Sequence, residues 1–223
     1  MIYLLSDLHG GECIGAFTKY LNEADDADLL IILGDIGLKF RDTEENRAFD
    51  ELILSSKKKI AFIDGNHENF DFLESFPMGE RYGAPVRILS ENVVWLQRGY
   101  VYEIEGKSFF TFGGCKSGEM WKTRGLVWPQ EVPTREELAR AYENLRAHGN
   151  KVDYILTHKF EQGSKVAETV ELRELCDYII KNVDYRMWYA GHWHAYKKGG
   201  EKLLFVYDVT VPLDAPIQNE LSL

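Results

Sequence analysis

The sequence predicts an α/β protein in which two packed β-sheets carry helices on their outer faces. Strands and helices alternate from the N-terminus onward, at a spacing typical of βαβ units and a mostly parallel sheet. Short β-rich segments then follow one another closely between residues 86 and 112, and the alternation resumes after residue 134. A chain of 223 residues is an ordinary length for one α/β domain, so we expect a single domain over residues 1–223.

The first part of the chain contains uninterrupted aliphatic runs, which are typical of buried strands. Apolar residues at helical spacing follow the first of these runs, and Thr43 and Asn69 stand where N-cap side chains are preferred. In chain order, we expect strand Ile2–Ser6, helix Cys13–Asn22, strand Asp28–Leu33, helix Glu44–Ser56, strand Lys59–Ile63 and a short helix after Asn69.

The second part opens with β-rich segments and closes with further strand–helix units. Gly106 stands at a hairpin turn, and Thr134 with Glu137 forms a capping box that begins a helix. Residues 113–132 are rich in Gly, Trp and basic side chains, so we expect irregular structure there. We expect strands Val86–Leu89, Val93–Leu96, Tyr100–Ile104 and Ser108–Phe112, a helix from Thr134 to about His148, strand Val152–Thr157, helix Val170–Val183, strand Tyr185–Ala190, and strands Tyr196–Lys198 and Lys202–Tyr207 around a Gly199-Gly200 turn.

The composition excludes several classes of protein. The net charge of −10 argues against a partner as large and as acidic as a long nucleic acid. The longest aliphatic run, Leu29–Leu33, is far too short to span a membrane, and the N-terminal segment does not resemble a signal peptide. Three widely spaced cysteines suit a reducing compartment, so we expect a cytoplasmic protein without disulfides. The oligomeric state does not follow from the sequence.

Five of the predicted strands are followed at once by His, Asp or Asn. In open α/β sheets ligands bind at the carboxyl ends of the strands, so these side chains stand where a site is expected. Imidazole and carboxylate groups bind Mn, Fe, Zn or Ni, while the lack of a Cys-x-x-Cys pair argues against a structural zinc site. Each residue alone is weak evidence, but the ordered set indicates a metal site formed by Asp7, His9, Asp35, Asn66, His67, His158, His192 and His194.

This ordered set resembles the calcineurin-like metallophosphoesterase superfamily, whose pattern is Asp-x-His, Gly-Asp, Gly-Asn-His-Asp/Glu, a lone His and Gly-His-x-His. All five blocks are present between Asp7 and His194. The resemblance implies a four-layer α-β-β-α sandwich of two mixed β-sheets with outer helices. It also implies a metal-dependent phosphoric ester hydrolase with two divalent metal ions, for which Mn is expected first and Fe, Zn or Ni are alternatives.

The resemblance further implies a role for each matching residue. One ion would be held by Asp7, His9 and His194, the other by Asn66, His158 and His192, and Asp35 would bridge them. His67 would be a catalytic residue that faces the substrate and protonates the leaving oxygen. A hydroxide bridging the ions would attack the phosphorus of a small phosphate ester, either a monoester or a diester.

The departures from the family pattern indicate which branch the chain resembles. Ser/Thr protein phosphatases carry an Asp, an Arg and a second Arg where this chain has Leu38, Lys39 and Phe70. Small stand-alone bacterial or phage-type metallophosphoesterases are more similar, because they share a Gly-Gly-x-x-Ser loop, an Arg and a Trp-Pro-x-Glu segment. These features correspond here to residues 113–117, Arg124 and residues 128–131. We expect Arg124 and Lys39 to bind substrate.

Several assignments in and around this loop stay open. Trp121 and Trp128 either stack on a base or aryl group of the substrate or pack on the edge of the sandwich. Asp64 or Asp71 is a candidate to orient His67, although a structural role is favoured for Asp64, as it is for Glu131.

Alternative functions also stay open. They are a Ser/Thr-type protein phosphatase, an oligonucleotide nuclease of the same superfamily, and a metal-binding scaffold with weak activity.

Overall fold

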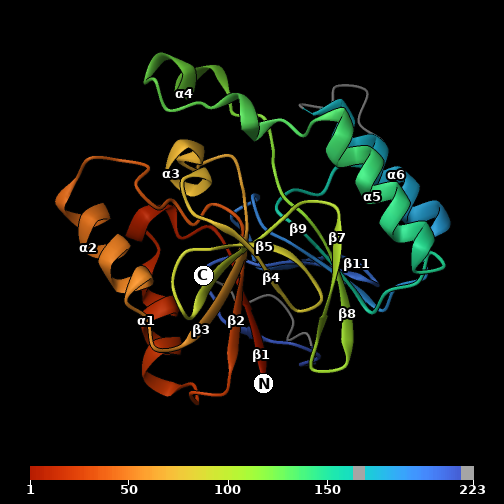
Figure 1. The fold of residues 1–223 in the computed structure, drawn as a ribbon, viewed down its shortest axis with the longest axis horizontal. Helices are drawn as coiled ribbons and strands as arrows, with labels where there is room; N and C mark the ends of the chain where they lie inside the picture. Colours follow the sequence, from red (N-terminus) through yellow and green to blue (C-terminus); the bar gives the residue numbers. More distant parts are fainter. Residues whose placement is uncertain (163–168, 217–223) are drawn as a thin grey trace.

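The computed structural model describes residues 1–162 and 169–216, and two β-sheets lie face to face at its centre (Figure 1). In the first sheet, β1, β2, β3 and β6 run parallel, and antiparallel strands complete both edges. The strand order is β13 (Val211–Pro212), β1 (Ile2–Leu5), β2 (Leu29–Leu33), β3 (Lys59–Ile63), β6 (Val93–Leu96), β5 (Ala84–Ile88) and β4 (Met78–Arg81).

The second sheet has the same design. Four parallel strands, β12, β10, β9 and β8, lie between one antiparallel strand at each edge. The strand order is β11 (Lys197–Gly200), β12 (Leu203–Phe205), β10 (Met187–Ala190), β9 (Tyr154–Thr157), β8 (Lys107–Phe112) and β7 (Tyr100–Ile104).

The helices cover the two outer faces. In Figure 1, α1 and α2 lie on one side of the sheets, α5 and α6 lie on the other, and α4 lies at the top above α3. None of the helices in the described ranges has both the length and the apolar character needed to cross a membrane. The helical elements are α1 (Ile14–Glu23), α2 (Glu44–Leu54), α3 (Phe70–Glu74), α4 (Glu119–Thr123), α5 (Arg135–Ala147), α6 (Val170–Asn182) and the 3₁₀ turns His9–Gly11 and Pro129–Glu131.

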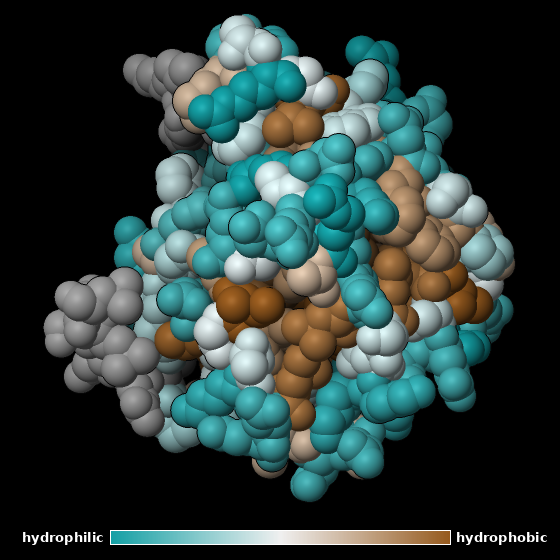
Figure 2. Space-filling model, turned by 90° about the vertical axis from the view of Figure 1, so that its left-hand side faces the viewer, coloured by the Kyte–Doolittle hydropathy of each residue, from teal (hydrophilic) through white to brown (hydrophobic). Residues whose placement is uncertain are grey.

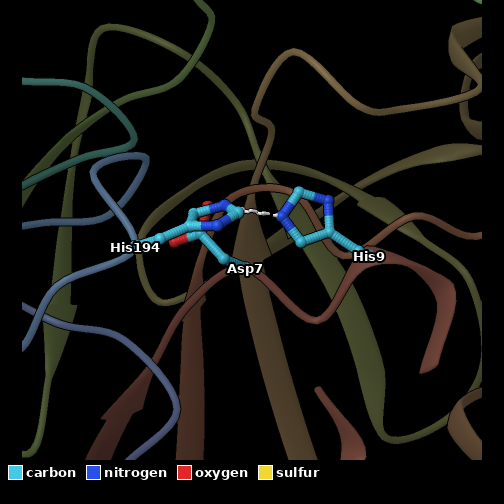
Figure 3. A group of neighbouring side chains, drawn as sticks. All are labelled: Asp7, His9 and His194. Atoms are coloured by element: carbon cyan, nitrogen blue, oxygen red, sulfur yellow. Dashed lines mark hydrogen bonds and ion pairs between the residues drawn. The ribbon is translucent and has the colours of Figure 1, made fainter. Parts of the chain in front are cut away.

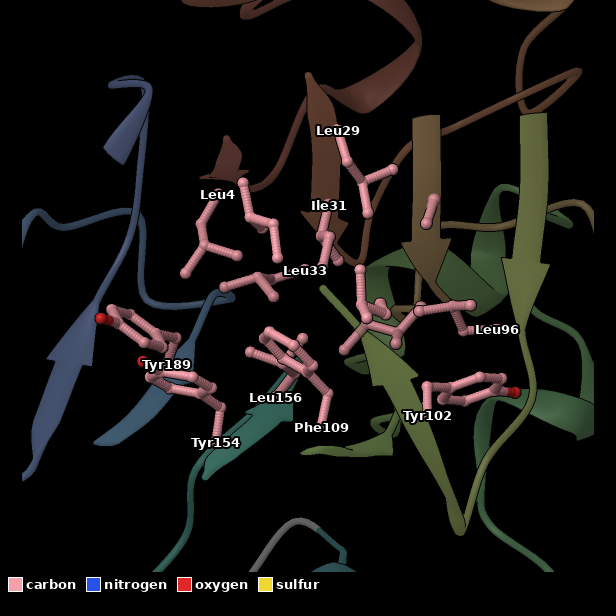
Figure 4. Packing of buried hydrophobic residues seen from close by; sticks show 14 of the residues in the cluster. Leu4, Leu29, Ile31, Leu33, Leu96, Tyr102, Phe109, Tyr154, Leu156 and Tyr189 are labelled. Carbon is pink, nitrogen blue, oxygen red and sulfur yellow. The ribbon is translucent and has the colours of Figure 1, made fainter. Parts of the chain in front are cut away.

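Three hydrophobic clusters join the layers, because the strands bury both of their faces. On β2, Leu29, Ile31 and Leu33 point into the cluster between the sheets, whereas Leu30 and Ile32 point into the cluster beneath α1 and α2. Figure 4 shows strands of both sheets contributing side chains to the cluster between them. A third cluster joins the second sheet to α5 and α6. The chain is therefore a four-layer α-β-β-α sandwich of two mixed sheets, as the sequence predicts.

The surface over α1 and α2 agrees with this arrangement. Figure 2 views the molecule from that side and shows a mostly hydrophilic face with a band of hydrophobic residues across its middle.

The predicted caps at Thr43, Asn69 and Thr134 are confirmed, since each side chain accepts a hydrogen bond from a backbone N–H in the first turn of its helix.

The structure differs from the sequence prediction at four elements. Strands β4 and β13 were not expected, because β4 is largely exposed and contains Gly79, and β13 has two residues and includes Pro212. The predicted turn at Gly199-Gly200 is wrong, since both glycines lie within β11, where Gly200 pairs with Leu203 and the register shifts at Gly199, and the turn follows at residues 201–202. Helix α4 forms inside the segment expected to be irregular.

Candidate metal centre

The predicted ligands meet because the strands that carry them are neighbours. Strands β1, β2 and β3 are adjacent and parallel in the first sheet, and β9 and β10 are adjacent and parallel in the second. Parallel neighbours end at the same edge of a sheet, so the three segments of the first sheet meet at one edge and the two of the second sheet meet at another. The contacts of His158 with Asp35 and of His9 with His194 join these two edges. All eight predicted residues belong to one cluster, in which neighbouring residues lie within hydrogen-bond or ion-pair distance of one another.

The first part of the cluster consists of Asp7, His9 and His194 (Figure 3). His9 Nε2 and His194 Nε2 lie 2.9 Å apart, and Asp7 Oδ1 lies 3.8 Å and 3.5 Å from them, respectively. This Oδ1 atom is buried and has no hydrogen-bond partner. An unpartnered buried carboxylate oxygen costs free energy unless a cation satisfies it, so the three side chains fit a divalent metal ion.

Asp35 occupies the middle of the cluster. Its Oδ2 atom lies 3.1 Å from His67 Nδ1 and 3.9 Å from His9 Nδ1, and its Oδ1 atom lies 3.4 Å from His158 Nε2. Burial alone would raise the pKa of the Asp35 carboxyl, but the three neighbouring imidazoles, above all His158, hold it well below its usual range. Asp35 is therefore a carboxylate that faces both halves of the cluster, which is the position expected of a bridging ligand.

The second part of the cluster gathers around His158. His158 Nε2 lies 3.2 Å from Asn66 Oδ1 and 3.3 Å from His192 Nδ1. On the other side of the ring, His158 Nδ1 lies 2.9 Å from the Leu33 carbonyl oxygen, which only accepts hydrogen bonds. Nδ1 therefore donates to this carbonyl, and Nε2 is the ring nitrogen that faces the site. Burial, followed by the charges of His158 and Lys159, lowers the pKa of His192 to about 2, so that His192 is a neutral donor.

The backbone that carries these donors has unusual dihedral angles. Five of the predicted ligands have φ between +46° and +68°, a left-handed region that residues with a Cβ atom rarely adopt. Such angles persist only where the surrounding structure imposes them, and they are typical of functional sites. A Cβ atom on Gly65 would come within 2.0 Å of Asp35 Oδ1, so glycine is required where β3 leads into Asn66. The five residues are Asp7, His9, Asp35, His192 and His194.

His67 contacts the other residues of the cluster through its backbone N–H and through one of its two ring nitrogens, Nδ1. Its backbone N–H donates to Asp35 Oδ1 over 2.7 Å, and its Nδ1 atom lies 3.2 Å from His9 Nδ1. The Nε2 atom is buried and has no hydrogen-bond partner, and the ring centroid lies 4.3 Å from that of Trp121. Nδ1 therefore faces the ligand set, whereas Nε2 is available for another group.

Neither candidate for orienting His67 does so. Asp64 accepts hydrogen bonds from Arg98 and from Trp95 Nε1, and Asp71 accepts one from Trp128 Nε1. The alternative that Asp64 or Asp71 orients His67 is not supported, because both carboxylates are engaged elsewhere and the carboxylate beside His67 Nδ1 is that of Asp35. The structural role predicted for Asp64 is confirmed, as is that of Glu131, whose buried carboxylate accepts from the Ser117 backbone N–H.

The predicted substrate-binding residues lie at the margin of the site. Lys39 Nζ is 3.8 Å from Asp50 Oδ2, and this side chain is half exposed. The guanidinium carbon of Arg124 lies 5.1 Å from the centroid of the Trp121 ring, which itself contacts His67. Arg41, which the sequence analysis did not single out, also lies beside this ring, with its guanidinium carbon 5.8 Å from the centroid, and is ion-paired with Glu12. No motif marks Arg41, although it is six residues after Asp35.

The family follows from a comparison with known proteins. A family model described as calcineurin-like phosphoesterase matches residues 1–196, which is most of the chain and includes every candidate ligand. The chain belongs to the calcineurin-like phosphoesterases. Members of this family carry out metal-dependent hydrolysis of phosphoesters. Among residues 1–162 and 169–216 of this calcineurin-like phosphoesterase, three groups of His and Asp side chains are close enough together to hold a metal ion.

Comparison of this calcineurin-like phosphoesterase with individual proteins adds a structural neighbour. A chain in the crystal structure of TT1561 of Thermus thermophilus is similar at 14% sequence identity with a TM-score of 0.46; the match covers 92% of this chain and 87% of that chain. No curated protein matches the sequence.

Proposed function

We propose that this calcineurin-like phosphoesterase hydrolyses small phosphate esters, monoesters or diesters, at a centre of two divalent metal ions. The observation that supports two ions rather than one is the position of Asp35. Its two carboxylate oxygens face different groups of donors, with His158 near Oδ1 and His67 and His9 near Oδ2.

Each group has the donors that one ion needs. Asp7, His9 and His194 would hold the first ion, Asn66, His158 and His192 the second, and Asp35 both. This mixture of imidazole, carboxylate and amide oxygen suits Mn first, with Fe, Zn or Ni as alternatives. Bound ions of this kind supply Lewis-acid activation of water and of the phosphoryl oxygens. Two divalent ions bring a charge of about +4 and the two Asp residues about −2, so the centre attracts phosphate despite the net charge of −10.

His67 supplies the proton transfer. Its Nδ1 atom is turned toward Asp35 and His9, which leaves Nε2 to donate a proton to the leaving oxygen. The buried, unpartnered state of Nε2 supports this role, because a hydrogen-bonding group without a partner is free to engage substrate. Arg124 and Lys39 are the cations proposed to bind the substrate at the margin of the site.

The test of this function combines metal analysis with hydrolysis. Protein stripped of metal and reloaded with Mn²⁺ should contain two ions per chain by elemental analysis, and it should hydrolyse para-nitrophenyl phosphate or its bis-ester. A content of one ion or none would refute the dinuclear centre. Two bound ions without hydrolysis of either ester would refute the activity and favour a metal-binding scaffold.

A further inference from the structure

The ring of Trp121 covers the catalytic face of His67. The two ring centroids are 4.3 Å apart with an interplanar angle of 55°, and the His67 Nε2 atom is buried. A leaving oxygen that takes a proton from Nε2 must approach to about 2.6–3.2 Å. Whatever substituent that oxygen carries is therefore placed against the indole of Trp121.

Cationic and aromatic side chains surround this indole. The guanidinium carbons of Arg124 and Arg41 lie 5.1 Å and 5.8 Å from the Trp121 ring centroid, and Phe40 lies 6.0 Å from it. Phe40 is buried and also lies 5.3 Å from the His67 ring. The rings of Phe40 and Trp121 and the guanidinium of Arg124 thus lie close to His67, whereas the guanidinium of Arg41 is ion-paired with Glu12. Flat apolar rings beside a positive charge favour an aromatic ring on which negative charge develops.

The two tryptophans of this loop have different environments. Trp128 donates from Nε1 to Asp71 Oδ2 over 2.9 Å and packs against the cluster beneath α1 and α2, so it belongs to the edge of the sandwich. Trp121 is partly exposed and lies on α4, a helix with no buried residue. Because no residue of α4 is buried, no core side chain anchors this helix, and the proposal requires Trp121 to shift when a leaving oxygen reaches Nε2.

We propose that Trp121 determines specificity by stacking on an aromatic leaving group of the substrate, such as an aryl ring or a nucleobase. Arg124 contributes by placing positive charge next to the departing ring. This inference depends on the proposed function, because it assumes that the leaving oxygen departs toward His67.

Binding of phosphonates tests the stacking without any turnover. Phenylphosphonate and methylphosphonate have the same charged group and a P–C bond that is not hydrolysed, so the ratio of their Kd values on the Mn²⁺-loaded protein reports the aromatic ring alone. Stacking of one ring on an aromatic side chain is expected to favour phenylphosphonate by about 5- to 100-fold. Trp121→Ala should abolish this preference, and Trp121→Phe should retain most of it.

Met120→Ala is the matched control, since Met120 is the preceding residue on α4 and is 58% exposed. It should leave the ratio unchanged within about twofold, as expected for an exposed side chain outside the stack. Equal Kd values for the two phosphonates in the wild type would overturn the proposal. Tighter binding of both by Trp121→Ala would also overturn it, because Trp121 would then be only an obstructing cover.

Rates of hydrolysis then show whether the aromatic group of the preferred substrate is an aryl ring or a nucleobase. Phenyl phosphate and phosphotyrosine carry the ring on the scissile oxygen, whereas in adenosine 5′-monophosphate a ribose lies between the ring and the phosphate. For whichever substrate is preferred, Trp121→Ala should reduce kcat/KM by about 5- to 100-fold while an alkyl phosphate is affected less than about threefold. An equal loss on aromatic and alkyl esters contradicts the stacking role. If the wild type binds neither phosphonate, it is the proposed phosphoesterase centre that fails.

Discussion

Replacement of Arg98 should show how much the buried ion pair behind the site contributes to the stability of the fold. Its guanidinium is 4% exposed and donates to Asp64 Oδ2, to Glu137 Oε2 over 3.1 Å and to the Gln130 carbonyl over 2.7 Å. Asp64 is completely buried and is followed directly by Gly65-Asn66-His67. Arg98→Met would remove the charge that compensates Asp64 while it keeps most of the apolar volume.

The expected cost is large because the remaining carboxylate stays buried. Breaking one partner of a buried ion pair costs about 3–5 kcal/mol of unfolding free energy. For a chain of this length, 1 kcal/mol corresponds to about 2–4 °C, so the melting temperature of Arg98→Met should fall by about 6–20 °C. Replacing both partners, as Asp64→Leu with Arg98→Met, should cost less than Arg98→Met alone, because the buried carboxylate of Asp64 is removed together with its partner, and Glu137 keeps its hydrogen bonds from Thr134.

Calorimetric or spectroscopic melting of the purified variants measures this effect. Lys151→Met is a matched control: Lys151 is 75% exposed and lies 3.9 Å from Asp184, and an exposed pair contributes at most about 1 kcal/mol. A loss of less than about 1 kcal/mol in Arg98→Met, or a double variant less stable than the single one, would refute the reasoning.

Four further predictions concern the site. Asp35→Asn should lower the content of both metal ions together and reduce activity, since it removes the carboxylate that faces both donor groups; full metal content and rate would exclude a bridging role. His67→Ala should keep the metals but lose about 10²–10⁴-fold in rate on alkyl esters and less on para-nitrophenyl esters, which need little protonation; equal losses on both would assign His67 to binding instead. Arg124→Ala should raise KM more than it lowers kcat. The wild type should hydrolyse a bis-aryl diester or a small nucleotide ester at least as well as phosphoserine peptides, and a strong preference for the peptides would contradict this. Burial and the neighbouring charges of His158 and Lys159 lower the pKa of His192 to about 2, whereas in the unfolded chain it binds a proton near pH 6.5. The metal-free protein should therefore lose stability as the pH falls below about 6.5, and melting curves of His192→Gln should show a smaller loss.

The sequence by itself determined the elements whose signals are local. Aliphatic runs marked the parallel strands, and the caps at Thr43, Asn69 and Thr134 marked helix starts to within a residue or two. It also determined where the donors gather, because the carboxyl ends of adjacent parallel strands lie at one edge whatever the details of packing. Asp7, Asp35 and Asn66 could be placed at one site for this reason alone, because they follow β1, β2 and β3 of the first sheet.

Only the tertiary structure decided which groups these side chains meet. Asp64 is paired with Arg98, 34 residues later in the chain, and Trp121, rather than Trp128, covers His67. Lys39 lies against Asp50 at the margin of the site. No periodicity or short motif connects the residues of these contacts, because the packing of the loops between the layers determines which residues meet. Local pattern specifies an element and its end, whereas the partner of a buried charge or an indole depends on which distant segment the fold brings beside it.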